Sequence, residues 1–409
     1  MRILYLSSVY PSLTAPTRGT YSRDLCHALQ QSCDVRVLSP VSWLEALTTP
    51  GSRTAEPQDP VPSSRPIYWY PPRVQRHRYG DWMWRSIRRH VEQVVGDFQP
   101  DWVISYWAHP DGEVALRAAR SCGARVAVSI GGSDVLLLTD NAKRRAAISK
   151  VLREVDLTFT VCDGLRNRVI ELGGSPERTH TSYQGIDLTT FTPGNQSEAR
   201  RSLDLPPSAP LFLWVGRMVA IKRLDVLLSA FQLVRKQLPD AQLALVGSGP
   251  QSEALRSYVH QHRLSQAVRF VGPVDRAGLP AWYRAADATV LSSDSEGLPN
   301  VLRESLACGT PFVSTDAGSI GEIAADEFSC VVRRGDADAL HRALLQILDS
   351  SYRDGVATYR PQSWTATAEQ QLRLMRDFDA RRHSTASASS QDVASQPLIA
   401  SQPLVAAEQ

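Results

Sequence analysis

The sequence predicts an α/β protein built from two doubly wound, Rossmann-like domains. Short β-rich runs alternate with amphipathic helical stretches along most of the chain, as in parallel βαβ units. This alternation restarts near residue 211, after a stretch that holds Pro193, Gly194, Pro206 and Pro207. The length of 409 residues is too great for one core and fits two domains of about 150–200 residues each.

The expected N-terminal domain spans residues 1–190. We predict strands at residues 3–7, 35–38, 102–106, 125–129 and 157–161, and helices at residues 22–30, 85–95, 114–121 and 163–172. Residues 45–66 interrupt the alternation with Pro, Ser and Thr and contain little apolar sequence, so we expect a mobile loop there.

The expected C-terminal domain spans residues 191–360. We predict strands at residues 211–215, 242–246, 268–271, 288–291 and 311–314, and helices at residues 223–237, 252–262, 278–286, 301–308 and 337–348. A helix over residues 361–383 is expected to cross back to the first domain. Residues 384–409 are mostly Ser, Ala and Gln and contain few large side chains, so we expect them to be disordered.

Composition narrows the class of protein. The net charge of +3 is too small to indicate nucleic acid as the partner. The six cysteines are scattered without a CxxC pair, which favours reduced thiols in the cytoplasm and argues against a metal site. No run of 18 apolar residues occurs, and the N-terminus is interpreted as a buried first strand without a cleavage signal.

The densest chemical signal is S-E-G-L-P-N-V-L-R-E-S, residues 295–305. Asn300 is a good candidate N-cap for the following helix, whose free amides and dipole suit a phosphate. Glu296 and Glu304 flank this helix start, and because carboxylates repel phosphate they suit neutral hydroxyls better. A capped helix with two surface acids is an equally good interpretation of this segment alone.

Two further strand ends carry candidate ligand groups. Gly216, Arg217 and Lys222 follow the strand at residues 211–215, and Arg and Lys are the side chains that bind phosphate oxygens. Gly19 follows Arg18 after the first strand, where a glycine lets the backbone approach a ligand. A solvated strand end and a simple turn are the alternatives. The absence of a GxGxxG motif disfavours an NAD-type fold.

These residues resemble a known family. S-E-G-L-P-N-V-L-R-E-S-L-A-C-G-T-P-F-V-S-T-D is similar to the signature of the retaining glycosyltransferases of family 4, which have the GT-B fold. V-G-R-M-V-A-I-K-R-L-D-V-L-L-S-A-F resembles the segment that holds the family's Arg and Lys pair, and L-V-G-S-G-P and V-R-F-V-G-P-V resemble its nucleoside-contacting loops. W-A-H-P-D-G-E-V-A-L-R-A-A-R and Y-Q-G-I-D-L-T-T-F-T-P match weaker patterns. The resemblance covers roughly residues 1–380.

The resemblance implies a role for each matching residue and a reaction without a metal ion or other cofactor. Arg217 and Lys222 would hold the diphosphate of a nucleotide-sugar donor and stabilise its charge as it leaves. Glu304 would bind ribose hydroxyls and Glu296 donor-sugar hydroxyls. The remaining donor contacts would come from Gly19, Gly216, Val271, Gly272, Gly297, Leu298, Asn300 and Val301.

The sequence departs from the family pattern where the family often has two histidines. One stretch reads Ile104-Ser105-Tyr106-Trp107, and Gly131 precedes Gly-Ser-Asp. We hypothesise that His109 faces the acceptor hydroxyl instead, in a catalytic group with Arg217, Lys222 and Glu296. A loop histidine bonded to the backbone is the alternative.

Residues 65–90 contain seven arginines, one acid and three tryptophans. Trp favours the headgroup boundary and Arg pairs with phosphate, so we expect a peripheral contact with the anionic inner face of the cell membrane. A solvated basic helix with core tryptophans is the alternative.

The function expected from all of this is transfer of a sugar from a UDP- or GDP-linked donor to a saccharide or lipid-linked acceptor in polysaccharide or glycolipid synthesis. The missing histidines leave a second interpretation open, a catalytically retired GT-B protein that binds nucleotide-sugar or a partner enzyme. A two-domain epimerase is a third, which the Glu-x7-Glu element disfavours.

Overall fold

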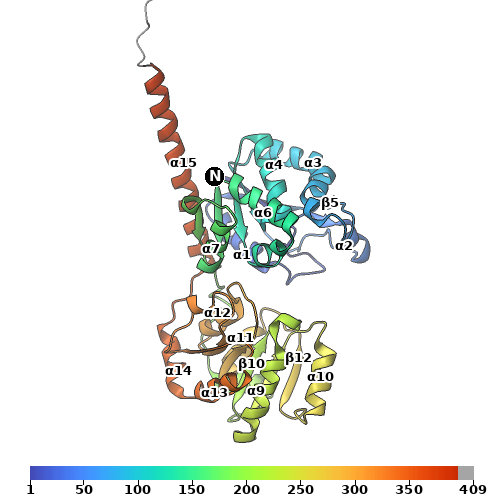
Figure 1. Cartoon of the computed structure of the whole chain (residues 1–409), viewed down its shortest axis with the longest axis vertical. Helices are drawn as coiled ribbons and strands as arrows, with labels where there is room; N and C mark the ends of the chain where they lie inside the picture. The colour runs from blue at the N-terminus through green and yellow to red at the C-terminus, as the bar shows by residue number, and fades with distance from the viewer. Residues whose placement is uncertain (395–409) are drawn as a thin grey trace, which may run out of the picture.

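The computed structural model describes residues 1–394, with side chains through residue 382. It contains two parallel sheets of seven and six strands, one in each half of the chain. Figure 1 shows the two lobes stacked along the long axis, with the chain passing from one to the other and back. The predicted α/β class with two doubly wound domains is confirmed.

The first sheet has the order β4-β2-β1-β6-β7-β8-β9, and every neighbouring pair is parallel. Its strands are β1 (Arg2–Leu6), β2 (Asp34–Leu38), β4 (Ser63–Ser64), β6 (Trp102–Tyr106), β7 (Arg125–Ile130), β8 (Leu157–Thr160) and β9 (Thr179–Thr181). The helices of this half are α1 (Thr20–Gln30), α2 (Trp43–Thr48), α3 (Tyr79–Phe98), α4 (Glu113–Cys122), α5 (Ser133–Leu136), α6 (Ala142–Glu154) and α7 (Asp163–Glu171). A separate two-stranded sheet joins β3 (Val41–Ser42) to β5 (Ile67–Tyr68).

The second sheet has the parallel order β12-β11-β10-β13-β14-β15. Its strands are β10 (Leu211–Val215), β11 (Gln242–Val246), β12 (Val268–Gly272), β13 (Ala288–Leu291), β14 (Phe312–Thr315) and β15 (Ser329–Val332). The helices of this half are α8 (Gln196–Ser202), α9 (Leu224–Gln237), α10 (Ser252–Gln261), α11 (Leu279–Ala285), α12 (Asn300–Ala307), α13 (Ala337–Gln346) and α14 (Ser350–Gly355). The strand β10 is buried along its whole length, as its unbroken apolar sequence LFLWV requires.

The last helix, α15 (Trp364–Ala394), runs along the N-terminal lobe (Figure 1). Its residues Leu372 and Met375 are buried against the first sheet, and Trp102 Nε1 donates to Asp379 Oδ2 at 3.0 Å. The two crossing segments lie side by side, because the Ile186 amide donates to the Gln362 carbonyl oxygen. The residue numbers of the domain boundaries stay a prediction.

Three expectations differ from the structure. Residues 45–66 are not wholly a loop, because α2 reaches Thr48 and β4 pairs with β2, with Val61 buried beneath them. The expected disorder from residue 384 is wrong as far as Ala394, because α15 continues there through Ser, Ala and Gln residues without a Gly or Pro to end it. The part of that prediction that covers residues 395–409 lies outside the described residues.

The third difference concerns α6, which the sequence analysis missed. Its apolar positions Ile148, Val151 and Leu152 follow helical spacing and are buried, and the Asn141 side chain caps its first turn. The Lys and Arg residues around these three apolar positions made the helical pattern hard to recognise in the sequence.

Candidate active site

The predicted cations and carboxylates meet where strands of the second sheet end. Lys222 ends a 3-10 turn, Ala220–Lys222, that follows β10, and Glu296 lies in the loop after the neighbouring strand β13. Lys222 Nζ lies 2.5 Å from Glu296 Oε1, and the Ser293 hydroxyl donates to the same oxygen at 2.6 Å. Arg217 is exposed just after β10, and no described residue forms a hydrogen bond or ion pair with its guanidinium.

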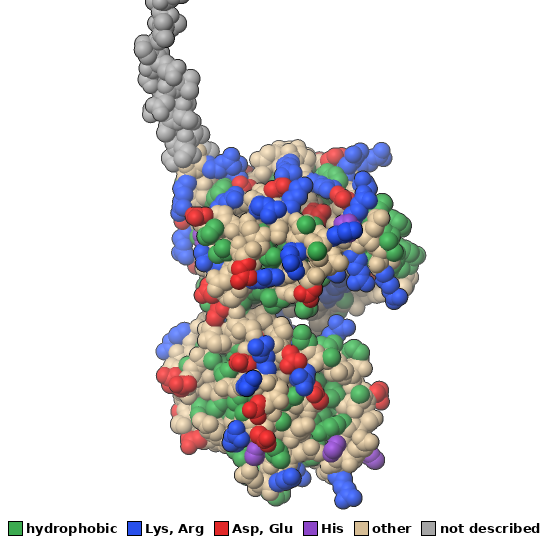
Figure 2. All heavy atoms as spheres, in the orientation of Figure 1, with side chains coloured by type: hydrophobic (Ala, Val, Ile, Leu, Met, Phe, Trp, Pro, Cys, Tyr) green, Lys and Arg blue, Asp and Glu red, His purple; other side chains and the backbone are tan. Residues whose placement is uncertain are grey.

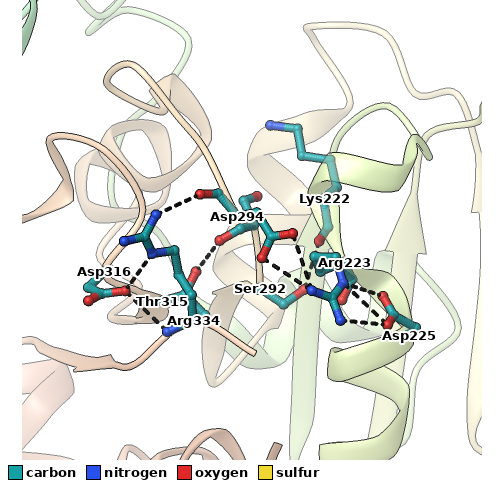
Figure 3. Close-up of polar contacts among 9 residues, drawn as sticks. Lys222, Arg223, Asp225, Ser292, Asp294, Thr315, Asp316 and Arg334 are labelled. Atoms are coloured by element: carbon teal, nitrogen blue, oxygen red, sulfur yellow. Dashed lines mark hydrogen bonds and ion pairs between the residues drawn. The ribbon is translucent and has the colours of Figure 1, made fainter. Parts of the chain in front are cut away.

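A polar network braces the loop that carries Lys222 (Figure 3). Ser292 Oγ lies 2.9 Å from the carbonyl oxygens of both Lys222 and Arg223, and the Asp294 amide donates to the Ile221 carbonyl oxygen. The Arg223 guanidinium binds Asp225 and Asp294 at once. The turn after β10 is therefore tied to the loop after β13.

The same network reaches the next strand along the sheet. Arg334 binds the Asp316 carboxylate and the Asp294 carbonyl oxygen, and Thr315 Oγ1 donates to the Ser293 carbonyl oxygen (Figure 3). Loops after β10, β13, β14 and β15 thus support one another near Glu296. Such support holds charged groups in place before a ligand arrives.

The start of α12 offers unpaired backbone amides. The N-cap is Pro299, which provides no side-chain cap, and Asn300 is the first helical residue. The prediction of Asn300 as N-cap is therefore wrong: its amide Nδ2 donates instead to Gln184 Oε1 at 2.8 Å, in the segment that joins the lobes. Without a side-chain acceptor, the first amides of α12, at Asn300 and Val301, are left for an anion.

The loop before α12 touches the N-terminal lobe. Leu298 is buried in the core of that lobe, and a Cβ on Gly297 would lie 3.3 Å from the Gly131 carbonyl oxygen. Gly318, at φ 68°, lies against the Glu296 carbonyl oxygen, where a side chain would clash. Small residues therefore let three backbone segments meet in the cleft.

Glu304 faces a separate part of the cleft. Its Oε2 accepts a hydrogen bond of 2.8 Å from Tyr283, and burial raises the pKa of its carboxyl group, while that hydrogen bond opposes the rise. A cavity of about 200 Å³ lies beside it between the lobes. Its lining residues include Thr17, Thr20, Tyr21 and Asp24 from one lobe and Val274, Arg276, Leu279, Asn300 and Glu304 from the other.

The predicted glycine and valine residues lie at strand ends and at the start of a helix. Gly19, at φ 75°, begins α1 with its Cα against the Val9 carbonyl oxygen, next to the cavity residue Thr20. Gly216 contacts Gly247 at the end of β10. Val271 and Gly272 end β12, and the space beside Gly272 is open within 4 Å.

His109 does not face the cleft. Its ring is 3% exposed, Nδ1 lies 2.6 Å from Glu113 Oε1, and Nε2 lies 2.9 Å from the Arg76 carbonyl oxygen. Both ring nitrogens are therefore used inside the N-terminal lobe, and the hypothesis that His109 meets the acceptor is not supported by this arrangement. The alternative interpretation, a loop histidine bonded to backbone, describes what the structure has.

Tyr106 occupies the space that a side chain at position 131 would need. A Cβ on Gly131 would collide with the Tyr106 hydroxyl, which accepts a hydrogen bond from Gln184 Nε2 at 3.3 Å. Because Gln184 also binds Asn300, the tyrosine is linked to the start of α12 through one side chain. Tyr106 and Gly131 are thus a matched pair in place of the two histidines.

Sequence reasoning missed several residues at the junction of the lobes. Arg276 forms an ion pair with Asp24 across the cleft and lies 3.7 Å from Asp187. Glu322 accepts hydrogen bonds from the Gly164 amide and the Tyr183 hydroxyl. Arg276 could have been found, since it is a basic residue just after β12, at the same edge as Arg217.

Two kinds of feature are absent from the part of the chain that the structure describes. Within residues 1–394, no helix is long and apolar enough to cross a membrane. Over the same span, no three His, Cys, Asp or Glu side chains gather so as to hold a metal ion.

Family models match most of the chain in two parts. Residues 18–185 match the glycosyl transferase 4-like domain, and residues 195–369 match glycosyl transferases group 1. D-inositol 3-phosphate glycosyltransferase 2 of Catenulispora acidiphila is 37% identical over 213 residues, which are 48% of this chain and 50% of that protein. This chain therefore spans about half the length of that relative. The putative teichuronic acid biosynthesis glycosyltransferase TuaC of Bacillus subtilis is 27% identical over 84% of this chain and 88% of its own length.

Solved structures share the fold. Sucrose-phosphate synthase from Thermosynechococcus elongatus has a TM-score of 0.74 and 22% identity, covering 93% of this chain and 100% of that one. HepE of Anabaena, in complex with UDP-glucose, has a TM-score of 0.68 and 17% identity over 94% of this chain and 100% of that one. With its two facing α/β lobes and matches to both family models, the chain belongs to the group 1 glycosyltransferases, family 4, and has the GT-B fold.

Proposed function

We propose that the chain is an active retaining glycosyltransferase of the cytoplasm that works without a metal ion. It takes a sugar from a UDP- or GDP-linked donor and transfers it to a saccharide or lipid-linked acceptor of the polysaccharide or glycolipid type. The observation that carries the proposal is the Lys222–Glu296 pair at the strand ends of the second sheet, where the unpaired Arg217 follows β10 and the uncapped α12 follows the loop of Glu296. In this proposal the cations and backbone amides bind the diphosphate of the donor, and the carboxylates accept hydrogen bonds from its hydroxyl groups.

Each group has a physical reason for its role. Arg217 and Lys222 supply the positive charge that stabilises the leaving diphosphate, and this electrostatic contribution dominates the catalysis. When the donor binds, the Lys222 ammonium turns to the phosphates, which frees Glu296 to accept hydrogen bonds from sugar hydroxyls. Glu304 accepts those of the ribose, because Tyr283 already orients its carboxylate.

The donor pocket is closed from the other side by the N-terminal lobe. Gly19 brings the backbone at the start of α1 close to the donor, while Gly297 and Leu298 hold the α12 loop against that lobe. Val271 and Gly272 contact the nucleobase of the donor. Since HepE was solved with UDP-glucose, UDP-linked sugars are the first donors to test.

A second candidate function rests on one specific observation. The buried His109 and the Tyr106–Gly131 pair leave the cleft without a histidine at either family position. A retired protein would bind nucleotide-sugar, or a partner enzyme, without turnover. The network around Lys222 argues against it, because so many contacts to one lysine loop have little use in an idle site.

The experiment is a metal-free turnover assay. Purified protein in EDTA is incubated with UDP- and GDP-sugars and mixed saccharide and polyprenyl-phosphate acceptors, and released nucleoside diphosphate is quantified by chromatography. We expect one donor to be consumed, with Lys222→Ala slower by about 100-fold or more and the exposed-lysine control Lys236→Ala unchanged. Donor that binds but is never consumed would favour the retired protein.

A further inference from the structure

One face of the N-terminal lobe exposes large apolar side chains. We define the basic–apolar face as α2 together with residues 65–89, which include β5 and the first half of α3. Four of the seven large apolar side chains that are exposed among the described residues lie on it: Leu47 (72% exposed), Ile67 (41%), Trp69 (47%) and Val74 (57%). Single exposed apolar residues are ordinary, whereas a group from one neighbourhood marks an interaction site.

Segments separated in sequence form this face together. β3 pairs with β5, and Trp43 at the start of α2 donates its Nε1 hydrogen to the Tyr70 carbonyl oxygen at 2.9 Å. The Trp69 amide donates to Ser86 of α3, and the Trp69 ring meets the Trp82 ring edge-on, with centroids 5.3 Å apart. Figure 1 shows α2, β5 and α3 gathered at one side of the upper lobe.

The backbone itself pushes an apolar side chain outward. Val74 sits between Arg73 and Gln75, whose φ angles of 64° and 47° lie in the left-handed region that residues other than glycine rarely adopt. The Tyr79 hydroxyl holds this turn, since it accepts from the Arg73 amide and donates to the Pro71 carbonyl oxygen. An apolar tip fixed in this way is placed for contact with a partner.

The face is strongly cationic around these apolar groups. Six of its arginines are exposed or half-buried, namely Arg73, Arg76, Arg78, Arg85, Arg88 and Arg89. Its two acids are already paired: Asp81 is bound by Arg117 and lies 3.8 Å from Arg78, and Glu45 is bound by Arg18. The seventh arginine, Arg65, is excluded because it is buried and donates to the Pro11 carbonyl oxygen. Figure 2 shows blue and green side chains together on this side of the upper lobe.

Two arginines are held in place by an aromatic ring. The guanidinium carbons of Arg78 and Arg85 lie 5.7 Å and 5.4 Å from the centre of the Trp82 ring. Stacking of this kind orients a guanidinium without neutralising it, so its N–H groups remain able to bind phosphate.

We propose that the basic–apolar face docks on an anionic lipid bilayer. Trp69, Ile67, Val74 and Leu47 enter the headgroup boundary, and the six arginines bind lipid phosphates around them. An aromatic and aliphatic centre with a cationic rim is complementary to such a surface in both polarity and charge. The face shares no residue with the donor site, so the inference stands apart from the proposed function.

The experiment is vesicle flotation of the full chain. Vesicles of phosphatidylcholine alone are compared with an equimolar mixture of phosphatidylcholine and phosphatidylglycerol, at low and at physiological salt. We expect the chain to bind the anionic vesicles and to bind the neutral vesicles at least tenfold more weakly. Two double variants test the face: Leu47→Ser with Trp69→Ser, and Arg88→Glu with Arg89→Glu. Each should bind the anionic vesicles at least tenfold more weakly than the unmodified chain does.

Matched controls come from the other lobe. Val331→Ser removes an exposed apolar side chain of similar exposure (41%), and Arg333→Glu reverses an exposed arginine. Both should bind as the unmodified chain does, and nucleotide-induced thermal stabilisation should be equal in all variants, which shows that they are folded. Failure of the unmodified chain to float at low salt would overturn the proposal, as would face variants that float normally. Tighter binding to a single-stranded oligonucleotide than to the anionic vesicles would overturn it as well.

Discussion

Lys222 and Glu296 form an ion pair with Nζ and Oε1 2.5 Å apart, although they come from loops after two different strands. The pair is held on both sides, by the Ser293 hydroxyl on the carboxylate and by Ser292 beneath the lysine loop. Lysine and glutamate side chains of 23% and 10% exposure remain reachable from the cleft. The two side chains are thus held in place by neighbouring residues and remain open to a ligand.

The cationic pair should be needed for turnover more than for binding. Arg217→Ala and Lys222→Ala are each expected to lower kcat by about 100-fold or more, because they remove charge stabilisation that matters most as the diphosphate leaves. The measurement is kcat and KM with the donor that the protein consumes. Arg201→Ala, at an exposed arginine of α8, is the matched control and should leave both constants unchanged. An equal loss in the control would contradict the assignment.

Arg223 should act by positioning Lys222. Its guanidinium ties Asp225 and Asp294 together, so Arg223→Ala loosens the lysine loop without removing a donor-binding group. We expect kcat to fall about tenfold, with a smaller change in KM, because a lysine displaced by a fraction of an ångström stabilises charge less well. Asp294→Asn should give a similar but weaker effect. An unchanged kcat in both variants would show that the network has only a structural role.

The ion pair between Asp24 and Arg276 should help to close the cleft over the nucleotide. Asp24→Ala and Arg276→Ala are each expected to raise the donor KM about tenfold, since the contact across the cleft is lost. The double variant should raise the donor KM no more than either single variant does, because the effects of substitutions that break the same contact are not additive. Additive losses would indicate that the two side chains contribute independently.

Asp111 should make the folded state less stable as pH rises. Burial raises the pKa of its carboxyl group to about 7, although hydrogen bonds from the Ser8 amide and hydroxyl lower it in part. Because the folded chain then binds more protons than the unfolded chain between about pH 4 and pH 7, stability falls with increasing pH over that range.

Asp111→Asn removes this titration while retaining an oxygen for Ser8. The loss of Tm between about pH 5 and pH 8 should therefore be smaller by several degrees in the variant. It should not vanish, since burial also raises the pKa of Asp134, to about 6. Asp97→Asn, at an exposed aspartate, is the control. A variant with the same pH dependence as the unmodified chain would remove Asp111 from the explanation.

Much of the architecture followed from periodicity, because buried strands such as β10 are continuous apolar runs and the helices between them are amphipathic. Contacts between the lobes could not be predicted in this way. The partners of Asn300 and Arg276 lie far away in sequence, and their pairing depends on how the two sheets face each other. His109 was misjudged for the same reason: its loop position suggested exposure, whereas Glu113, one helical turn later, draws the ring inward.

The candidate donor residues were predicted mainly from their resemblance to the family's motifs. Lys222, Glu296 and Asn300 also lie after a strand or at a helix start, where sequence position indicates the edge of the sheet. Tyr106 was noted only as part of a stretch in which the family often has a histidine. Its contact with Gly131 shows that the two departures compensate each other, which no single position reveals.

The central claim is that Glu304 and its neighbours bind a nucleotide-sugar, and thermal shift tests it most directly. Purified protein is screened without metal against UDP, GDP, ADP and their common sugars, beside Glu304→Ala and the exposed-residue control Glu253→Ala. We predict selective stabilisation by one nucleotide and its sugars, retained in Glu253→Ala and lost in Glu304→Ala. Stabilisation by none of them, or equal stabilisation in Glu304→Ala, would contradict the account.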